Sequence, residues 1–338
     1  MRLFYLFSIR QKNDKIKIEW RKCGMKYMVG LKNTDTDLVE CIKKNKENIY
    51  EVYFSWGDIP NGRTSQLESE RYAPWEMQEM QRNALAELSK EGIALNLLFN
   101  ANCYGKDSQS RAFFNKVGTI IDYVAETYGL QSITTTSPLI AKFVHQNFDE
   151  IEVRASVNME IGTVQGMEYL AEYFDSYYMK RELNRDFDAI KKLHKWCEEN
   201  GKKMFLLANS GCLNHCSAHN FHDNLVAHEA EIAQMDNAYE FHGICKEFLK
   251  NENHYQALID NTNFIRPEDM HLYEPYFVAA KLATRIHRNP SMVVNSYMRA
   301  KYSGNILELL EPAHNIYPYV IENGSPLKLR KIDEEFSI

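Results

Sequence analysis

The chain has 338 residues, and its 40 Lys and Arg residues against 46 Asp and Glu residues give a formal net charge of −6. This balance argues against a broadly basic nucleic-acid-binding protein, so we expect no nucleic-acid partner. With 44% hydrophobic and 25% charged residues, the composition is that of a folded protein rather than a disordered chain. Its 15 glycines and 9 prolines are too few for an all-β fold with a turn after every short strand.

The sequence offers no membrane or export signal. No apolar run approaches the ~20 residues that a membrane helix needs, and the apolar stretch at the N-terminus lacks a small-residue cleavage site. We therefore expect a cytoplasmic protein with no membrane contact. Thiols stay reduced in that compartment, so clustered cysteines indicate ligands or catalysts rather than disulfides.

The chain begins with two short alternating stretches separated by QKND, which predict a β-hairpin extension over residues 1–25. From residue 26, short apolar runs alternate with longer amphipathic stretches, and this alternation is typical of parallel βα units. The predicted strands are 27–31, 51–56, 94–99, 132–135, 152–157, 176–179, 204–208 and 278–283. The predicted helices are 36–46, 74–91, 113–128, 164–173 and 187–200.

Eight strand-then-helix units predict an α/β fold, a closed TIM-like (β/α)8 barrel over residues 26–310. No G-x-G-x-x-G turn follows an early strand and no P-loop occurs, which argues against a nucleotide-binding sheet. Residues 212–263 form an enlarged Cys/His-rich insertion after strand seven, and residues 311–338 form a C-terminal tail. Because the loops that follow barrel strands build the catalytic face, we expect the active site there.

The enlarged loop concentrates side chains that bind metals. Between Cys212 and Cys245 lie three of the seven cysteines, with Cys216 as the third, and five of the eleven histidines. Thiolates bind zinc or iron, and several from one loop plus one distant residue close a four-ligand site. If the segment is helical, Cys212 and Cys216 share one face. Cys103 follows strand three on the same catalytic face and is the candidate fourth ligand, with His219 as a further candidate metal ligand.

Polar residues also follow several strands. Arg154, Ser156 and Asn158 alternate along strand five, so we expect them to point into the barrel mouth. Lys180, Arg181 and Glu182 follow strand six, where a structural ion pair among them is as good an interpretation as a catalytic role. Other polar residues placed after strands are Asp58, Arg63, Asn100, Asn102 and Asn209.

The middle of the chain resembles a known family. The stretch VRASVNMEIGTVQGMEYLAEYFDSYYMKRELNRDFDAIKKL, with its R-E-L motif at 181–183, is similar to the peptidase family called U-thirty-two, or collagenase-like. The later stretch NFIRPEDMHLYEPYFVAAKLATRIHR resembles that family's segment in which an R-P-E-D-like motif precedes a strand ending in K-x-x-x-R, here Lys281 and Arg285. The resemblance covers roughly residues 27–305.

The resemblance implies a TIM-like barrel and, through several members, an enzyme with a 4Fe-4S cluster for oxygen-independent hydroxylation. It implies that Cys212, Cys216 and Cys245 match cluster ligands. The family's usual H-G-A-L-C-x-x-Y-S-G-x-C stretch is replaced here by NSGCLNHCSAHNFHDN. The short C-terminal tail favours a small-molecule or peptide-sized substrate over folded RNA.

Three functional hypotheses follow. The first is an iron–sulfur oxidoreductase or hydroxylase in which Arg154, Arg181 and Arg285 bind a carboxylate or phosphate through bidentate contacts. The second is a zinc-dependent hydrolase or peptidase with Glu182 or Glu229 as general base, although H-E-x-x-H is absent. The third makes the metal structural and the protein a non-catalytic partner of a homologous barrel subunit.

Overall fold

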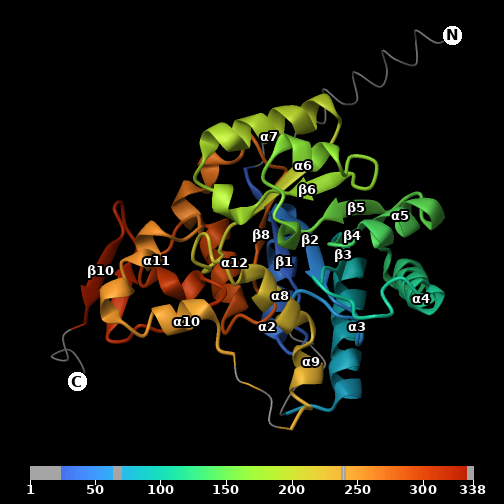
Figure 1. The fold of residues 1–338 in the computed structure, drawn as a ribbon, viewed down its shortest axis with the longest axis horizontal. Coiled ribbons are helices and arrows are strands. Elements are labelled where there is room, and N and C mark those ends of the chain that lie inside the picture. The colour runs from blue at the N-terminus through green and yellow to red at the C-terminus, as the bar shows by residue number, and fades with distance from the viewer. Residues whose placement is uncertain (1–23, 64–70, 237–238, 240, 333–338) are drawn as a thin grey trace.

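The computed structural model describes residues 24–63, 71–236, 239 and 241–332, and its centre is a closed barrel of eight parallel strands in chain order (Figure 1). The TIM-like barrel is therefore confirmed. The strands are β1 (Lys26–Gly30), β2 (Ile49–Phe54), β3 (Leu95–Phe99), β4 (Ser132–Thr135), β5 (Glu152–Ala155), β6 (Ser176–Tyr178), β7 (Lys203–Leu207) and β8 (Ala279–Leu282). The hairpin predicted over residues 1–25 lies, except for its last two residues, outside the described residues.

Helices surround the barrel between successive strands (Figure 1). The main ones are α2 (Thr36–Lys44), α3 (Pro74–Lys90), α4 (Arg111–Tyr128), α5 (Pro138–Asn147), α6 (Val164–Glu168), α7 (Phe187–Glu199) and α12 (Pro290–Met298). Short 3₁₀ helices are η1 (Lys46–Asn48), η2 (Val157–Met159), η3 (Arg181–Leu183), η4 (Glu252–His254), η5 (Pro267–Leu272) and η6 (Ile306–Leu309). Within the described residues, no helix is long and apolar enough to cross a membrane.

The helices begin where the sequence supplies caps. Asp35 accepts from Leu38 N at 2.9 Å at the start of α2, and Ser110 accepts from Phe113 N at 3.1 Å at the start of α4. These side chains satisfy backbone N–H groups that have no partner inside the helix. Pro74 is the first residue of α3, where its missing N–H costs nothing.

The enlarged loop after β7 contains four short α-helices. They are α8 (His219–Ala227), α9 (Glu229–Ile232), α10 (Ile244–Phe248) and α11 (Ala257–Asp260). Part of the segment that was predicted as a tail forms an antiparallel pair, β9 (Tyr319–Glu322) with β10 (Lys328–Lys331). Figure 1 shows this pair at the edge of the molecule, away from the barrel.

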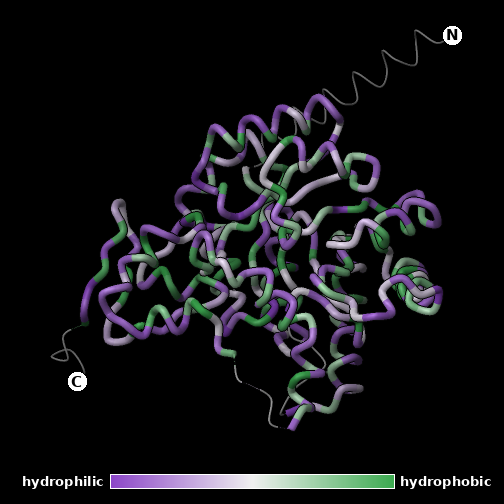
Figure 2. The backbone as a smooth tube through the Cα atoms, viewed as in Figure 1, coloured by the Kyte–Doolittle hydropathy of each residue, from purple (hydrophilic) through white to green (hydrophobic). Residues whose placement is uncertain are grey.

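Several barrel strands are largely apolar, since both of their faces are buried. All five residues of β3, LNLLF, are buried, as a parallel sheet covered by helices requires. Figure 2 shows the hydrophobic segments gathered at the centre and the hydrophilic ones on the outer helices. A second, separate apolar cluster fills the barrel interior around Met28, Tyr53, Tyr178 and Phe205.

The barrel interior also holds a charged group, Arg154, which the sequence placed at the mouth. Its guanidinium pairs with Glu51 and, at 2.9 Å, with Glu152 Oε1, and Nε donates to Ser176 Oγ at 3.2 Å. Glu152 and Ser176 are the first residues of β5 and β6, so this network lies at the amino-terminal end of the strands. Arg154 lies in register with Ser176, the first residue of β6, so its side chain enters the barrel interior below the mouth.

Candidate active site

A small buried cavity lies at the carboxyl ends of the barrel strands. Four cationic side chains and one carboxylate line it: Arg63, Arg181, Lys281, Arg285 and Glu311. Tyr53, Asn100 and Asn158 add polar groups. The cavity therefore carries an excess of positive charge, although the whole chain is acidic, and such a concentration indicates a site for an anionic group.

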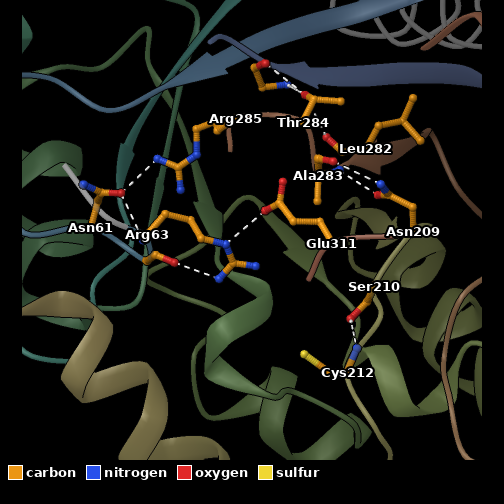
Figure 3. Close-up of polar contacts among 12 residues, drawn as sticks. Asn61, Arg63, Asn209, Ser210, Cys212, Leu282, Ala283, Thr284, Arg285 and Glu311 are labelled. Carbon is orange, nitrogen blue, oxygen red and sulfur yellow. Dashed lines mark hydrogen bonds and ion pairs between the residues drawn. The ribbon is translucent and has the colours of Figure 1, made fainter. Parts of the chain in front are cut away.

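The Asn61 side chain, in the loop after β2, accepts from the Arg285 guanidinium and from the backbone of Arg63 (Figure 3). Arg285 Nη1 donates to Asn61 Oδ1 at 2.9 Å, and the same oxygen accepts from the backbone N–H of Arg63 at 3.2 Å. The Arg63 side chain turns the other way, with Nε 3.1 Å from Glu311 Oε1. Asn61 thus ties the Arg285 guanidinium to the backbone of the loop at Arg63. Burial, aided by Arg63, lowers the pKa of Arg285 to about 10, so Arg285 stays charged at neutral pH.

Lys281, in β8, extends into the same cavity. Its Nζ lies 4.1 Å from the centre of the Tyr53 ring and 5.2 Å from that of Tyr178. Burial, together with the neighbouring Arg285 and Arg63, lowers the pKa of Lys281 to about 7. The amine is therefore poised between its charged and neutral forms near neutral pH, which is typical of functional sites.

Glu311 comes from the segment that the sequence assigned to the tail. Its backbone N–H donates to Asn209 O at 3.0 Å, and Gly211 N donates to Glu311 O at 3.1 Å, so the segment pairs with the chain just after β7. A side chain at Gly211 would place its Cβ 2.2 Å from Pro312 O, so this close approach requires glycine. Among the described residues, Glu311 Oε2 has no hydrogen-bond partner, which leaves it available to a ligand.

Asn209 serves the fold rather than a substrate. Its Nδ2 donates to Ala283 O at 3.0 Å and to Leu309 O at 2.9 Å, and its Oδ1 accepts from Ala283 N at 2.7 Å. These bonds join the ends of β7 and β8 to η6, as Figure 3 shows in part. The amide is satisfied, so its role is to hold the mouth together.

The residues predicted after β5 and β6 separate into two groups. Asn158 lines the cavity and donates to Asn100 O at 3.2 Å. Arg181 also lines it and donates to Cys212 Sγ at 3.8 Å. Glu182 instead forms an ion pair with Lys180 at 2.9 Å, which is the structural alternative that the sequence left open.

His219 is engaged at both ring nitrogens. Its Nδ1 lies 2.5 Å from Glu160 Oε1, and its Nε2 lies 3.4 Å from Asp223 Oδ2 and contacts Arg181. An imidazole held in this way has no nitrogen available for a metal. The structure therefore places His219 in an ionic network beside the mouth rather than in a ligating position.

Of the four candidate cysteine ligands, Cys212, Cys216 and Cys245 lie near one another, and Cys103 lies apart from them. Burial, followed by the charges of Cys212 and Cys216, raises the pKa of Cys245, so these three thiols lie within electrostatic range. Cys103 has other neighbours: His228, followed by the backbone N–H of Gly105, lowers the pKa of its thiol. The segment between Cys212 and Cys216 is not helical, and α8 begins only at His219, so the expected shared helix face is absent.

The R-P-E-D motif also serves the fold. Arg266 makes a bidentate pair with Asp269, at 2.7 Å for each contact. Glu268 Oε1 accepts from Tyr302 N at 2.8 Å and from Asn323 Nδ2 at 2.9 Å. The motif thus holds the chain around β9, outside the mouth cavity.

No family model matches the chain. In sequence, it is 24% identical over 292 residues to the "Uncharacterized protease MJ1657" of Methanocaldococcus jannaschii, which covers 83% of this chain and 81% of that protein. In fold, it matches the U32 Peptidase Mk0906 with a TM-score of 0.54 at 11% identity, over 76% of this chain and 91% of that one. The chain resembles the U32 peptidases. The resemblance expected from the sequence is therefore confirmed, and this U32-like chain places Lys281 and Arg285, the residues of its K-x-x-x-R motif, in the mouth cavity.

The sequence missed two features of this U32-like site. Glu311 carries no local pattern, since it reaches the mouth only through pairing beyond β7. Tyr53 was placed within an apolar strand, yet its ring lies below Lys281, and its hydroxyl donates to Leu282 O at 2.7 Å. The sequence did offer one signal for Tyr53, because its polar hydroxyl group stands within an otherwise largely apolar predicted strand.

Proposed function

We propose that the protein is an enzyme that holds a carboxylate of a small or peptide-sized substrate in the mouth cavity. The observation that carries the proposal is the convergence of Arg63, Lys281 and Arg285 on one buried space, where Glu311 is the single carboxylate among the described lining residues. Arginine suits this task because its planar fork matches carboxylate geometry. The names of the two relatives, a protease and a peptidase, support a peptide as the substrate.

The size of the cavity indicates which part of the substrate enters. Its volume of about 30 Å³ is little more than the space of one or two water molecules. It accommodates a terminal group rather than the body of a substrate. A wider cavity of about 680 Å³ shares Asn158 with it, and that volume is typical of ligand sites. We assign the body of the substrate to the wider cavity.

The donors that would meet the carboxylate are available. Arg285 uses Nη1 for Asn61, while its Nε and Nη2 make no hydrogen bond to any residue that the structure describes. Lys281 likewise has ring contacts but no acceptor among those residues. Each would gain its first charged hydrogen-bond acceptor from a bound carboxylate, and charge-assisted bonds of this kind are about twice as strong as neutral ones.

The proposal is tested with a matched pair of probes, N-acetyl-alanyl-alanine as the free acid and as the amide. Isothermal titration should detect binding of the acid and at least ~30-fold weaker binding of the amide, since a desolvated charge pair contributes about 2 kcal/mol or more. Arg285→Met should remove the preference for the acid. Arg288→Met, at an exposed position near β8, is the control and should keep it.

Equal binding of acid and amide by the wild-type protein would contradict the proposal. So would an Arg285→Met variant that is folded by circular dichroism and still prefers the acid.

A second candidate is the iron–sulfur oxidoreductase or hydroxylase that the family resemblance implies. It is favoured by the grouping of Cys212, Cys216 and Cys245 beside the mouth, where Cys212 contacts Arg181 of the cavity wall. However, across residues 24–63, 71–236, 239 and 241–332, no group of three His, Cys, Asp or Glu side chains is arranged to hold a metal ion. The expected four-cysteine set does not fit a cluster as these side chains lie, so we assign no reaction step to one.

Metal analysis tests this second candidate. After anaerobic reconstitution with iron and sulfide, it predicts a brown protein with about four irons per chain. Cys212→Ser and Cys245→Ser should lose most of the iron, while Cys103→Ser should retain it, because Cys103 lies with His228. A colourless protein with stoichiometric zinc would support the hydrolase instead, and loss of iron in Cys103→Ser would restore the four-cysteine set.

A further inference from the structure

Lys281 is a buried amine that forms no ion pair with any residue that the structure describes. It lies in register with Leu207, the last residue of β7, so its side chain starts near the carboxyl ends of the strands. The residue is only 6% exposed. Its Nζ contacts two aromatic rings, that of Tyr53 at 4.1 Å and that of Tyr178 at 5.2 Å from the ring centres. Both tyrosine hydroxyls donate elsewhere in the barrel, at 2.7 Å and 2.8 Å.

This environment gives the Lys281 amine the features of a nucleophile. Ring faces stabilise an ammonium less than a carboxylate does, and burial beside two guanidinium groups disfavours the charged form. Burial, followed by the charges of Arg285 and Arg63, accordingly lowers the pKa of Lys281 to about 7. A desolvated lysine next to another cation is the general setting of lysines that attack carbonyl groups. The neutral amine keeps its N–H donors and adds a lone pair.

A carboxylate-binding group stands beside this amine. The guanidinium carbon of Arg285 lies 5.9 Å from the centre of the same Tyr53 ring, and both cationic side chains line the mouth cavity. A side chain at Gly30 would place its Cβ 2.7 Å from Arg285 Cγ and 2.7 Å from the Tyr53 hydroxyl, so glycine makes room for this packing. A carboxylate bound to Arg285 is therefore placed to present its neighbouring carbon atom to Lys281.

The size of the mouth cavity limits what that neighbouring group can be. The cavity of about 30 Å³ accommodates a carboxylate and one further small group. A ketone carbonyl next to the carboxylate fits this space and is the group with which a neutral amine condenses. A 2-oxo acid carries both groups on adjacent carbons, and the rest of such a molecule would extend into the wider cavity that shares Asn158.

We propose that Lys281 forms a Schiff base with the carbonyl group of a 2-oxo acid whose carboxylate is bound by Arg285. The proposal rests on the proposed function for the binding of the carboxylate. It deepens that function by naming the class of small-molecule substrate and the residue that reacts with it.

The reaction consumes no oxidant, reductant or cofactor. The lone pair of Lys281 Nζ forms a bond to the carbonyl carbon while the π electrons of the carbon–oxygen bond move to the oxygen. One proton passes from the nitrogen to that oxygen, which gives a carbinolamine. The carbon–oxygen bond then breaks, the oxygen leaves as water with the second amine proton, and the carbon–nitrogen double bond forms. Water is the only co-product.

Reductive trapping with pyruvate tests the proposal. With pyruvate and sodium cyanoborohydride at pH 7, peptide mass mapping should find the reduced adduct on Lys281 at least ~10-fold more than on Lys192, an exposed lysine of α7 that is almost wholly charged at this pH. Lactate, which has the carboxylate but no carbonyl, should give no adduct. Lys281→Arg keeps a cation and removes the nucleophile, so its adduct at this position should be lost. A wild-type Lys281 that is modified no more than Lys192 would overturn the proposal.

Formaldehyde, a carbonyl compound without a carboxylate, separates this proposal from the proposed function. With cyanoborohydride it should methylate Lys281 faster than Lys192, and Arg285→Met should reduce trapping by pyruvate at least ~10-fold more than methylation by formaldehyde. Equal pyruvate trapping in Arg285→Met and the wild-type protein would overturn the carboxylate site and, with it, the oxo-acid assignment. Preference for the acid over the amide of N-acetyl-alanyl-alanine, with Lys281 unmodified by either carbonyl compound, would overturn the Schiff base alone.

Discussion

Arg154→Met should destabilise the protein by about 3–5 kcal/mol, the range for breaking one side of a buried ion pair. Arg154 is fully buried and lies between Glu51 and Glu152, with its guanidinium 4.2 Å from the centre of the Phe205 ring. Methionine fills similar space but leaves Glu51 buried without its cation. Urea unfolding followed by circular dichroism measures the loss.

The double variant Glu51→Leu/Arg154→Met separates charge from packing. The double variant also removes the carboxylate that Arg154→Met leaves unpaired. Its destabilisation should therefore be smaller than the sum of the destabilisations caused by Glu51→Leu alone and Arg154→Met alone. Additive effects would show that the pair does not interact. The exposed Arg288→Met should leave the free energy of unfolding nearly unchanged.

The ion pairs that Glu152 forms with Arg154 and Lys203 make the stability of the protein depend on pH in the acidic range. Although burial alone would raise it, Arg154 and Lys203 hold the pKa of Glu152 at about 2, below its usual value of 4.5. The stabilisation is therefore complete above pH 4.5 and is lost as the pH falls toward 2. Lys203→Met should therefore lose less free energy of unfolding than the wild-type protein as the pH falls from 4.5 toward 2.

Lys281→Met should stabilise the protein by about 2–4 kcal/mol at pH 6–7. Each unit of pKa difference between the folded and unfolded chain corresponds to ~1.4 kcal/mol, and the expected value is set below the full product. The pKa of Lys281 falls from 10.5 to about 7 on folding, so the unfolded chain binds the proton more tightly. The wild-type protein therefore gains stability as the pH rises from 7 to 10.5, whereas the variant lacks this gain. The difference between them should shrink over that range.

Urea unfolding at pH 6.5 and pH 10 measures this difference. Lys192→Met, on the exposed face of α7, is the control and should show no such pH dependence. A Lys281→Met variant less stable than the wild-type protein at pH 6.5 would mean that the Lys281 ammonium has a strong acceptor in the folded state. In that case the cavity would be neutralised from within and would not attract an anion.

The barrel was predictable because its strands are short apolar runs, each followed by an amphipathic helix. All eight predicted strands coincide with observed ones to within a few residues, including β4 at 132–135. In a parallel sheet that is buried on both faces, the strands are continuous hydrophobic segments of the sequence. The segments 138–147 and 290–298 were not predicted as helices, although each begins with a proline.

The site was predictable only in part, because its geometry depends on pairings distant in sequence. Asn158, Arg181 and Arg285 do line the mouth, since each follows a strand closely. Arg154 lies deeper, because it is in register with Ser176, the first residue of β6. Cys103 was grouped with Cys212 because both follow barrel strands, but α8 and α9 bring His228 to it instead. No local pattern links positions 103 and 228.

A structure of the complex with N-acetyl-alanyl-alanine tests most directly the claim that the mouth cavity binds a carboxylate. The terminal carboxylate is expected within hydrogen-bonding distance of Arg285 and Lys281, with the acetyl end in the cavity that Cys103 lines. A dipeptide bound with its carboxylate in solvent, or held on another surface while the mouth keeps only water, would contradict the account.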